Sequence, residues 1–505
     1  MKNNVLIVGA GPTGLAMALT FTKLGVPFRI IEKNDGPGET SRALVTQARI
    51  LEHYQQLGIS EKVVTGGIPL TAVHIREGHE DKAELKFKDL GGGLSPFPYV
   101  LSIPQDVHER LLVDELEKAG VTIEWGTELV SFSDKRDDVE AVIKQNGEEK
   151  AYSFHYLCGC DGTHSTVRHG MKTDFPGGTY EQQFFVADVE AESESLVLGD
   201  MYMNMEANGF FVFMPVRKKG IVRLIGIVPE EINTEASIDF WDIYPTVKKK
   251  LDMTVLQVNW FSTYKVHHRV SESFREGRVF IAGDAAHIHS PAGGQGMNTG
   301  IGDAINLAWK LACVIQGKGS IDIVESYENE RHAFANTLVS TTDRAFTNII
   351  GRHVKGRLLR TVFFPYILPF LLGFSSARKG LFKTVSQTRI HYRDSKISEG
   401  SVGKLRGGDR LPWVKTGAGD NFAPLQTFDW QVHCYGKANQ EVKSDLASTS
   451  IPLHEYEWDP SMITSGLKEN ALYLIRPDGY IGFAGEDLEA LKQYVNRFDI
   501  KPFFR

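Results

Sequence analysis

The chain has few cysteines and no long hydrophobic run, and both absences narrow its class. The four cysteines, Cys158, Cys160, Cys313 and Cys434, contain no CxxC pair and no plausible disulfide framework, which is consistent with a reducing compartment. The longest apolar stretch, TVFFPYILPFLLGF at 361–374, holds two prolines and is shorter than the roughly 20 residues that cross a bilayer. We therefore expect no transmembrane segment and interpret this stretch as a buried helical connector, in preference to a contact with a membrane surface.

The sequence also lacks an excess of positive charge. Its 56 Lys and Arg against 63 Asp and Glu give a net charge of −7, which offers no basic footprint for nucleic acid and favours a small-molecule partner. The apolar run at the N-terminus is short and broken by glycines, with no cleavage site behind it, and predicts a cytoplasmic protein. A length of 505 residues exceeds one hydrophobic core and predicts two or three domains.

Glycine is abundant, and its first cluster follows a predicted strand. Val5–Val8 is an apolar, β-branched run typical of a buried parallel strand. The next six residues are Gly9, Ala10, Gly11, Pro12, Thr13 and Gly14. In such a G-x-G-x-x-G turn, Gly9 makes the tight bend, Gly11 lets a pyrophosphate approach, and Gly14 allows close packing of the following helix. We expect that helix to end at Gly25, where a left-handed residue is favourable.

A carboxylate then appears at the spacing that a dinucleotide site requires. The predicted strand Phe28–Ile31 places Glu32 eighteen residues after Gly14, close to the roughly twenty expected for a residue that binds a ribose. The pattern predicts dinucleotide binding, against the alternative of an ordinary glycine-rich turn. It leaves FAD and NAD both open.

A second segment, GCDGTHSTVR, follows another predicted strand at Tyr156–Cys160. Asp161 begins a turn, and Ser165 is suited to cap the short helix after it. Taken alone, this is a surface turn in which Asp161 and Arg168 pair.

A third segment reads RVFIAGDAAHIHSPAGGQGMNTG. Val279–Ala282 predicts a buried strand, and Asp284 follows at its carboxyl end, where open α/β sheets bind ligands. The glycine-rich loop Pro291–Gly296 leads into a helix that we expect to begin near Asn298 or Thr299. The helix N-terminus then points at the ligand, with unpaired N–H groups and a partial positive charge.

Together these segments resemble the class A flavoprotein aromatic hydroxylases, the family of para-hydroxybenzoate hydroxylase, phenol and polyketide hydroxylases and rifampicin monooxygenase. GAGPTGL, GCDGTHSTVR and GDAAHIHSPAGGQGMNTGIGDAINLAWKLA match that family's three fingerprints in order. GGDRLPWV and ALYLIRPDGYIGF resemble the C-terminal extension of the phenol and polyketide branch. The resemblance implies FAD as cofactor, NADPH or NADH and O2 as cosubstrates, and hydroxylation of an aromatic, polyketide or antibiotic-like molecule through a flavin C4a-hydroperoxide.

The resemblance also implies a set of site residues. Those expected to bind the cofactor are Gly9, Gly11, Pro12, Thr13, Gly14, Glu32, Lys33, Arg42, Gln105, Asp161, Arg168, Asp284, Pro291, Gly296, Met297 and Asn298. Those expected beside the reacting ring are Arg42, Pro291 and Gly296. Asp161 would serve FAD and NAD(P)H together, and Asp284 would accept hydrogen bonds from the ribityl hydroxyls.

Other readings of the chain are weaker or remain open. His287 and His289 lack further nearby ligands, so no metal site is predicted, and Trp309 and Lys310 are interpreted as structural. The alternatives to oxygen insertion are an FAD-dependent reductase or dehydrogenase and a non-catalytic flavin-binding module. A halogenase is disfavoured because no WxWxIP-like segment is present.

The predicted fold class is α/β and α+β. We expect a Rossmann-like FAD-binding domain at 1–75, 100–172 and 275–345, and an antiparallel-sheet substrate domain at 76–99 and 173–274. A helical connector at 346–396 then leads to a thioredoxin-like domain at 397–505. Because it lacks a CxxC pair, that last domain is expected to have a structural role. The protein would act as a monomer or a homodimer.

Overall fold

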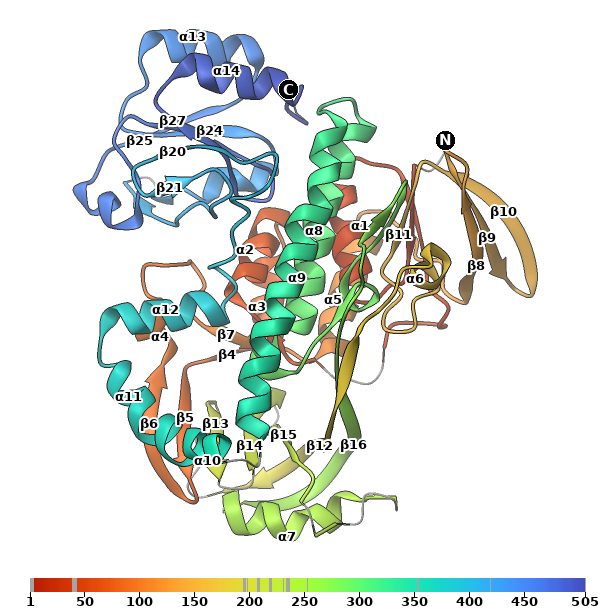
Figure 1. The fold of residues 1–505 in the computed structure, drawn as a ribbon, viewed down its shortest axis with the longest axis vertical. Helices are drawn as coiled ribbons and strands as arrows, with labels where there is room; N and C mark the ends of the chain where they lie inside the picture. The colour runs from red at the N-terminus through yellow and green to blue at the C-terminus, as the bar shows by residue number, and fades with distance from the viewer. Residues whose placement is uncertain are drawn as a thin grey trace.

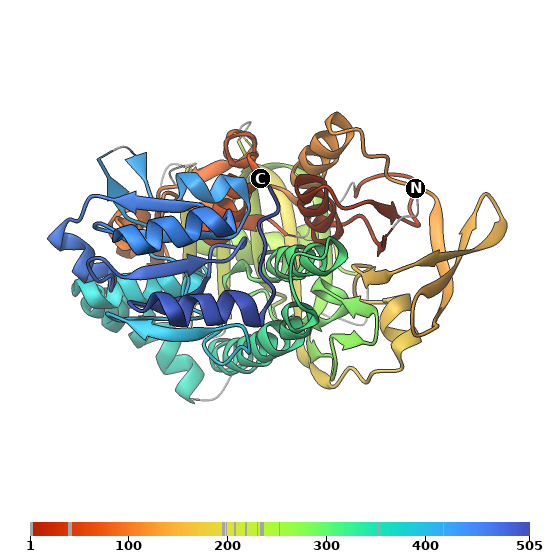
Figure 2. The ribbon, with the colours of Figure 1, turned by 90° about the horizontal axis from the view of Figure 1, so that it is seen from above.

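The computed structural model describes residues 4–38, 43–193, 197, 199–206, 209–217, 220–229, 231–232, 237–251, 253–351, 354–417 and 419–504. Two long helices run through the middle of the molecule, with a large sheet at one end and a separate sheet with two helices at the other (Figure 1). A small three-stranded sheet projects from the side of the molecule (Figure 2).

The five-stranded sheet is assembled from three separated parts of the chain. Its order is β17-β18-β11-β1-β2, and its strands are β1 (Val5–Val8), β2 (Phe28–Ile31), β11 (Tyr156–Gly159), β17 (Arg275–Glu276) and β18 (Val279–Ile281). The last four strands in this order pair in parallel. The helices that share a hydrophobic core with this sheet include α1 (Pro12–Leu24), α5 (Gln105–Lys118), α8 (Gly296–Ile315) and α9 (Ile321–Ile350). The strands predicted before each glycine-rich segment are confirmed.

Local sequence explains how α1 begins and ends. Pro12 occupies the first turn, where a missing N–H has no intrahelical partner. Gly25 ends the helix at φ 67°, a left-handed conformation that costs glycine little. A Cβ added to Gly14 would lie 1.9 Å from the carbonyl oxygen of Gly9. The predicted close approach of helix and strand is therefore confirmed, and it leaves no room for a side chain.

An eight-stranded sheet lies at one end of the molecule. Its order is β19-β16-β12-β15-β14-β13-β5-β6, and its strands are β5 (Ala72–Glu77), β6 (Glu80–Lys86), β12 (Gly177–Glu192), β13 (Met201–Glu206), β14 (Gly209–Arg217), β15 (Ile221–Ile227), β16 (Thr254–Val270) and β19 (His287–Ile288). Helix α7 (Phe240–Leu251) packs on one face. The other face packs against the end of α9. The strands predicted around 209–214 and 222–227 are confirmed.

Shorter elements complete the part of the chain before the connector. They are β3 (Val45–Thr46), β4 (Ile68–Leu70) and β7 (Val100–Ser102) in one sheet, β8 (Thr127–Asp134), β9 (Val139–Gln145) and β10 (Glu148–Phe154) in another, and the helices α2 (Ala48–Leu57), α3 (Ser60–Gly66), α4 (Phe87–Gly91) and α6 (Thr166–Met171).

The connector is helical but not buried, so the expected burial of its apolar run is wrong. It comprises α10 (Val354–Leu358), a π-helix (Leu359–Ile367), α11 (Leu368–Leu371) and α12 (Ser375–Val385). Phe370 is 71% exposed and Phe374 is 57% exposed. In the described part of the chain, no single helix is long and apolar enough to cross a membrane. One pair, 354–371 with 375–385, meets that length and composition jointly but is bent by 116°.

The C-terminal residues form a thioredoxin-like unit. Strand β24 (Gln431–Tyr435), α13 (Gln440–Thr449) and the parallel strand β25 (Leu453–Tyr456) are followed by an antiparallel pair, β26 (Leu472–Ile475) and β27 (Ile481–Gly485), and by α14 (Leu488–Arg497). Two short strands, β20 (Glu399–Val402) and β21 (Leu405–Arg406), extend this sheet. Cys434 is a free, buried thiol on β24, and the other three cysteines are also free and buried.

A buried histidine predicts how the stability of this fold depends on pH. His108 on α5 is fully buried, with Nε2 2.8 Å from the hydroxyl of Tyr54, and burial lowers the pKa of His108 to about 4. Between pH about 6.5 and 4, the unfolded chain takes up a proton that the folded chain excludes. The contribution of His108 to stability should therefore be complete above the unfolded pKa and fall by about 1.4 kcal/mol per pH unit from there down to a pH of about 4.

Thermal unfolding followed across this pH range tests the assignment. His108→Gln should flatten the decline of the unfolding midpoint with falling pH, whereas His79→Gln at an exposed position should follow the wild type. An unchanged decline in His108→Gln would show that other groups control the acid sensitivity.

Candidate dinucleotide and flavin site

The three glycine-rich segments meet at the carboxyl ends of β1, β11 and β18. A Cβ added to Gly9 would lie 2.4 Å from the carbonyl oxygen of Cys160 and 3.0 Å from Cα of Asp161. Likewise, a Cβ on Gly283 would lie 2.5 Å from Oγ1 of Thr13. Segments about 150 and about 270 residues apart in sequence are thus in direct contact, as in the ligand-binding crevice of an open α/β sheet.

The turn after β1 leaves space where a phosphate would approach. Gly11 differs from its neighbours because an added Cβ there would meet nothing within 4 Å. Glu32 lies beside this turn, and its Oε2 accepts a hydrogen bond of 2.9 Å from the N–H of Ala10. Lys33 is exposed next to it. An open backbone turn at the start of α1 with an adjacent carboxylate fits a dinucleotide, with phosphate over the turn and ribose on Glu32.

The second segment holds one carboxylate oxygen without a partner. Oδ2 of Asp161 accepts from the N–H of Val167 at 3.1 Å, while Oδ1 is buried without a hydrogen bond, and burial raises the pKa of Asp161. Ser165 caps α6 as predicted, accepting from the N–H of Arg168. Arg168 donates to the carbonyl oxygens of Thr163 and Ala285 rather than to Asp161. The geometry therefore leaves Asp161 Oδ1 to accept from a ligand hydroxyl.

The third segment presents a helix N-terminus to the same crevice. Helix α8 begins at Gly296, not near Asn298 or Thr299 as expected. Gly293 and Gly294 precede it with φ of 73° and 63°, which favour glycine. The turn can start early because Gln295 is held by side-chain hydrogen bonds from outside the segment.

Asn298 fastens this loop to the segment that follows β2. Its Oδ1 accepts from the N–H of Gln47 at 2.8 Å, and its Nδ2 donates to the carbonyl oxygens of Val45 and Gly294 at 2.8 and 2.7 Å. Gln47 also donates to the carbonyl oxygen of Gly293 at 2.9 Å. Gln47 was not predicted from the sequence, because nothing local marks it as a partner of a loop nearly 250 residues later.

The remaining predicted residues lie around the same crevice. Gln105 begins α5, and its Oε1 accepts from the N–H of Ala43 at 3.2 Å, which places it beside the segment that follows Arg42. Arg42 itself lies outside the described residues. Asp284 is exposed in the 3-10 turn Gly283–Ala285. Pro291 is exposed, and Met297 is half-buried in the first turn of α8.

Comparison with known proteins agrees with this geometry. The family model described as "FAD binding domain" matches residues 2–342. The chain belongs to this family. The 6-methylpretetramide 4-monooxygenase of Streptomyces rimosus is 33% identical over 95% of this chain and 90% of its own length. A rifampicin monooxygenase of Rhodococcus hoagii is 28% identical over 96% and 95%, respectively.

A solved structure extends the match to the whole architecture. The OxyS anhydrotetracycline hydroxylase from Streptomyces rimosus superimposes with a TM-score of 0.79 and 26% identity, covering 99% of this chain and 100% of that one. The resemblance to class A flavoprotein hydroxylases is therefore confirmed, and the protein is an FAD-binding enzyme of the flavoprotein monooxygenase type.

A buried carboxylate that was not predicted from the sequence, Asp303, supports the turn after β18. Oδ2 of Asp303 on α8 accepts from the N–H of Gly283 at 3.1 Å and lies 2.7 Å from Nε2 of His287. Its Oδ1 accepts from Nε of Arg331 on α9 at 2.6 Å. Burial opposes ionisation of Asp303, but Arg331 and His287 hold its pKa below the usual value. His287 is thus a partner of Asp303, and the described residues contain no group of three or more potential metal ligands.

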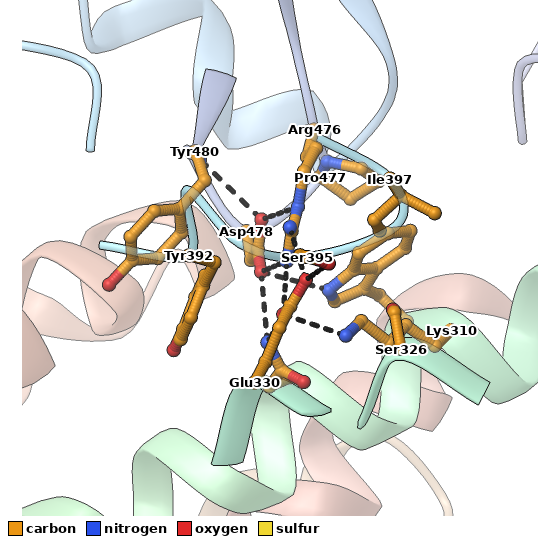
Figure 3. Close-up of polar contacts among 12 residues, drawn as sticks. Lys310, Ser326, Glu330, Tyr392, Ser395, Ile397, Arg476, Pro477, Asp478 and Tyr480 are labelled. Atoms are coloured by element: carbon orange, nitrogen blue, oxygen red, sulfur yellow. Dashed lines mark hydrogen bonds and ion pairs between the residues drawn. The ribbon is translucent and has the colours of Figure 1, made fainter. Parts of the chain in front are cut away.

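Next to Arg331, Glu330 joins the FAD-binding part of the chain to the thioredoxin-like unit (Figure 3). Arg476, at the end of β26, donates two hydrogen bonds to Glu330 at 2.8 and 2.9 Å, and Lys310 donates one at 2.7 Å. Asp478 in the β26–β27 turn accepts from Arg476 and from Nε1 of Trp309. All five side chains are almost completely buried, which agrees with the structural interpretation of Trp309 and Lys310.

Replacing Asp284 with alanine should weaken retention of FAD. Loss of charge-assisted hydrogen bonds from the ribityl hydroxyls is expected to cost roughly 1–3 kcal/mol of binding free energy. Fluorescence titration of the apoprotein with FAD measures this, with Asp137→Ala, an exposed carboxylate in the turn between β8 and β9, as the control. Equal affinity in Asp284→Ala and wild type would remove Asp284 from the flavin site.

Replacing Glu330 with glutamine should destabilise the junction between the two parts of the chain. Asp478 still pairs with Arg476, but the change leaves one buried positive charge of the cluster, at Lys310, without a counter-charge, which typically costs roughly 3–5 kcal/mol. We expect a lower unfolding temperature and faster proteolytic release of the C-terminal unit. Glu325→Gln is the matched control, because Glu325 lies on the same helix in an exposed pair with Lys396. Equal behaviour of the two variants would contradict the proposed role.

Proposed function

We propose that the protein is an FAD-dependent monooxygenase that uses NAD(P)H and O2 to hydroxylate an aromatic, polyketide or antibiotic-like small molecule. The observation that carries the proposal is that a largely apolar, aromatic sheet face contacts, through Val45, the glycine loop at the start of α8. The near full-length similarity to enzymes named for such substrates supports it.

The apolar face belongs to the eight-stranded sheet and is closed by α9. The buried cluster formed between this face, α9 and the segment before β3 comprises Leu44, Tyr180, Phe184, Met205, Phe210, Val212, Met214, Val216, Val266, Phe346 and Ile350. Val45 packs against this cluster, and a Cβ on Gly294 would lie 2.9 Å from Val45 Cβ. A planar substrate on this face would therefore lie beside the flavin loop, in surroundings that exclude water.

Buried polar groups interrupt the apolar face, among them the Arg223–Asp188 ion pair and the hydroxyl of Tyr180. The hydroxyl of Tyr180 donates to Oδ1 of Asp343 at 2.5 Å, and Nδ1 of His268 lies 3.4 Å from the same oxygen. Burial, together with the hydrogen bond to Asp343, raises the pKa of Tyr180, and because its O–H is donated to Asp343, the phenol oxygen is left as an acceptor. A fixed polar group in an apolar surface is suited to orient a substrate hydroxyl.

The protein's own contribution is to position and stabilise. Bound FAD supplies hydride acceptance from NAD(P)H and the activation of O2. The N–H groups at the start of α8 stabilise negative charge on the ring nearby. Asp161, Asp284 and Glu32 accept from ligand hydroxyls, which fixes the dinucleotide in the crevice. Asn298 keeps the loop and the segment after β2 in register.

Substrate-stimulated NAD(P)H oxidation tests the function. Phenols, anthraquinones, tetracyclines and rifamycins should be screened with O2 uptake and product mass recorded together, and with ¹⁸O2 as the oxygen source. The proposal expects one labelled oxygen in the product. Flavin reduction without incorporation of oxygen would identify a reductase, and flavin that NAD(P)H never reduces would identify a binding module.

Tyr180→Phe examines the polar group on the substrate face. Loss of one hydrogen bond of 1–2 kcal/mol should lower kcat/KM roughly 5- to 30-fold while FAD affinity stays unchanged. Tyr152→Phe on the exposed strand β10 is the control. Full activity in Tyr180→Phe would remove this residue from substrate orientation.

A further inference from the structure

The connector carries a continuous stripe of exposed apolar side chains. Six of them are spaced four residues apart: Val354, Leu358, Val362, Tyr366, Phe370 and Phe374. Their exposed fractions run from 41% to 75%. Ile367 and Leu371, 43% and 40% exposed, widen the stripe. Scattered exposed hydrophobics are normal, but a contiguous row of this length marks a surface that is covered in use.

The geometry of the helix keeps the row from Val354 to Phe370 on one side, and the ring of Phe374, beyond the helix end, contacts that of Phe370. In a regular α-helix, a step of four residues overshoots one turn by about 40°, so a long i, i+4 series would wind around the helix. The π-helix at 359–367 has more residues per turn and takes back part of that rotation. A π-helix in the middle of the connector therefore aligns the apolar side chains before and after it.

The opposite side of the connector is anchored to the protein. Arg360 is almost completely buried and donates to the carbonyl oxygens of Glu206 at 2.7 Å and of Gly351 at 3.0 Å. Pro365 and Leu372 are buried as well. The helix is thus a fixed part of the fold with one face held and one face presented outward. In Figure 1 it lies at the outer edge of the molecule, beside β5 and β6.

Within the connector's own sequence the charge is entirely of one sign, although the hydroxyl of Tyr366 in the stripe donates to Glu77 on the neighbouring strand β5. Between Asp343 and Asp394 the sequence contains no acidic residue, although the whole chain has a net charge of −7. The same interval contains ten basic residues: Arg344, Arg352, Lys355, Arg357, Arg360, Arg378, Lys379, Lys383, Arg389 and Arg393. Lys355, Arg357, Lys379, Lys383 and Arg389 are exposed at the two ends of the stripe. Partial desolvation of the Lys383 amine lowers its pKa, and the neighbouring charges of Arg410, Lys379 and Arg389 lower it further.

We propose that the connector docks on an anionic lipid surface, with the apolar stripe entering the outer acyl region and the flanking Lys and Arg side chains among the headgroups. An amphipathic helix that lies in the plane of the interface has this composition, and anionic lipid adds attraction for each basic residue. The 116° bend between the two helical parts suits a segment that lies along a surface.

A second copy of the chain fits this face poorly. A two-fold contact brings the same patch of both copies together, so the basic ends of one stripe would meet the basic ends of the other. Like charges brought together at an interface oppose association. The nearest acidic side chains, Glu77 and Glu84 on β5 and β6, alternate with Arg76, Lys82 and Lys86 and do not form a complementary patch.

Vesicle co-sedimentation of the FAD-loaded protein tests the docking surface. Binding is expected to vesicles that contain phosphatidylglycerol, to fall with added salt, and to be weak on pure phosphatidylcholine. The double variant Phe370→Ser, Phe374→Ser should bind the anionic vesicles more weakly by a factor of roughly ten or more. The double variant Lys355→Glu, Arg357→Glu should lose most of the salt-sensitive part of the binding. Ile463→Ser and Lys437→Glu, exposed positions on the thioredoxin-like unit, serve as controls, with FAD content confirming folding.

Three results would overturn the proposal. The first is failure of the wild type to sediment with anionic vesicles at low salt. The second is equal binding to anionic and to pure phosphatidylcholine vesicles, or undiminished binding by the Phe370→Ser, Phe374→Ser variant. The third is a dimer in solution, measured by light scattering, that Phe370→Ser and Phe374→Ser convert to monomer, because the stripe would then be covered by a second copy.

Discussion

Two consecutive residues on α9 connect this helix to the thioredoxin-like unit and to the turn after β18. Neighbouring residues on a helix point about 100° apart, so Glu330 and Arg331 reach different partners. Glu330 takes Arg476 and Lys310, and thereby fixes the thioredoxin-like unit. Arg331 takes Asp303, which in turn holds the N–H of Gly283 at the carboxyl end of β18. A single turn of α9 therefore connects to the C-terminal unit through Glu330 and to the turn after β18 through Arg331.

The charges at this junction are balanced, which is why they can be buried. Lys310 and Arg476 carry two positive charges, and Glu330 and Asp478 carry two negative ones, all within direct hydrogen-bonding distance. Burial lowers the pKa of Lys310 to about 8 in spite of Glu330. Burial acts against Glu330 as well, yet Arg476 and Lys310 hold its pKa well below the usual value. The thioredoxin-like unit, which has no CxxC pair, is thus attached to α8 and α9 through a buried cluster of balanced charges.

The sequence was most informative where function imposes local geometry. The turn at Gly9 and the cap at Ser165 follow from sterics and hydrogen bonding within a few residues, and the structure has both. Pairings between distant residues could not be predicted in this way. Glu330 and Arg476 lie 146 residues apart, and each alone reads as an ordinary surface charge. The predicted burial of the connector was wrong for a related reason. An apolar run is buried only if another element covers it, and that depends on residues distant in the sequence.

The start of α8 shows how the connector and the flavin loop depend on each other. Gln387, just after α12, donates to Oε1 of Gln295 at 2.6 Å and to Oγ1 of Thr299 at 3.0 Å, and Gln295 donates to the carbonyl oxygen of Val385 at 3.0 Å. These bonds allow the helix to begin at Gly296, two residues earlier than its own sequence suggests. The N–H groups at the start of α8 are therefore positioned by the end of the segment whose other end carries the exposed stripe. A surface that holds the connector would act on the same hydrogen bonds that define the flavin loop.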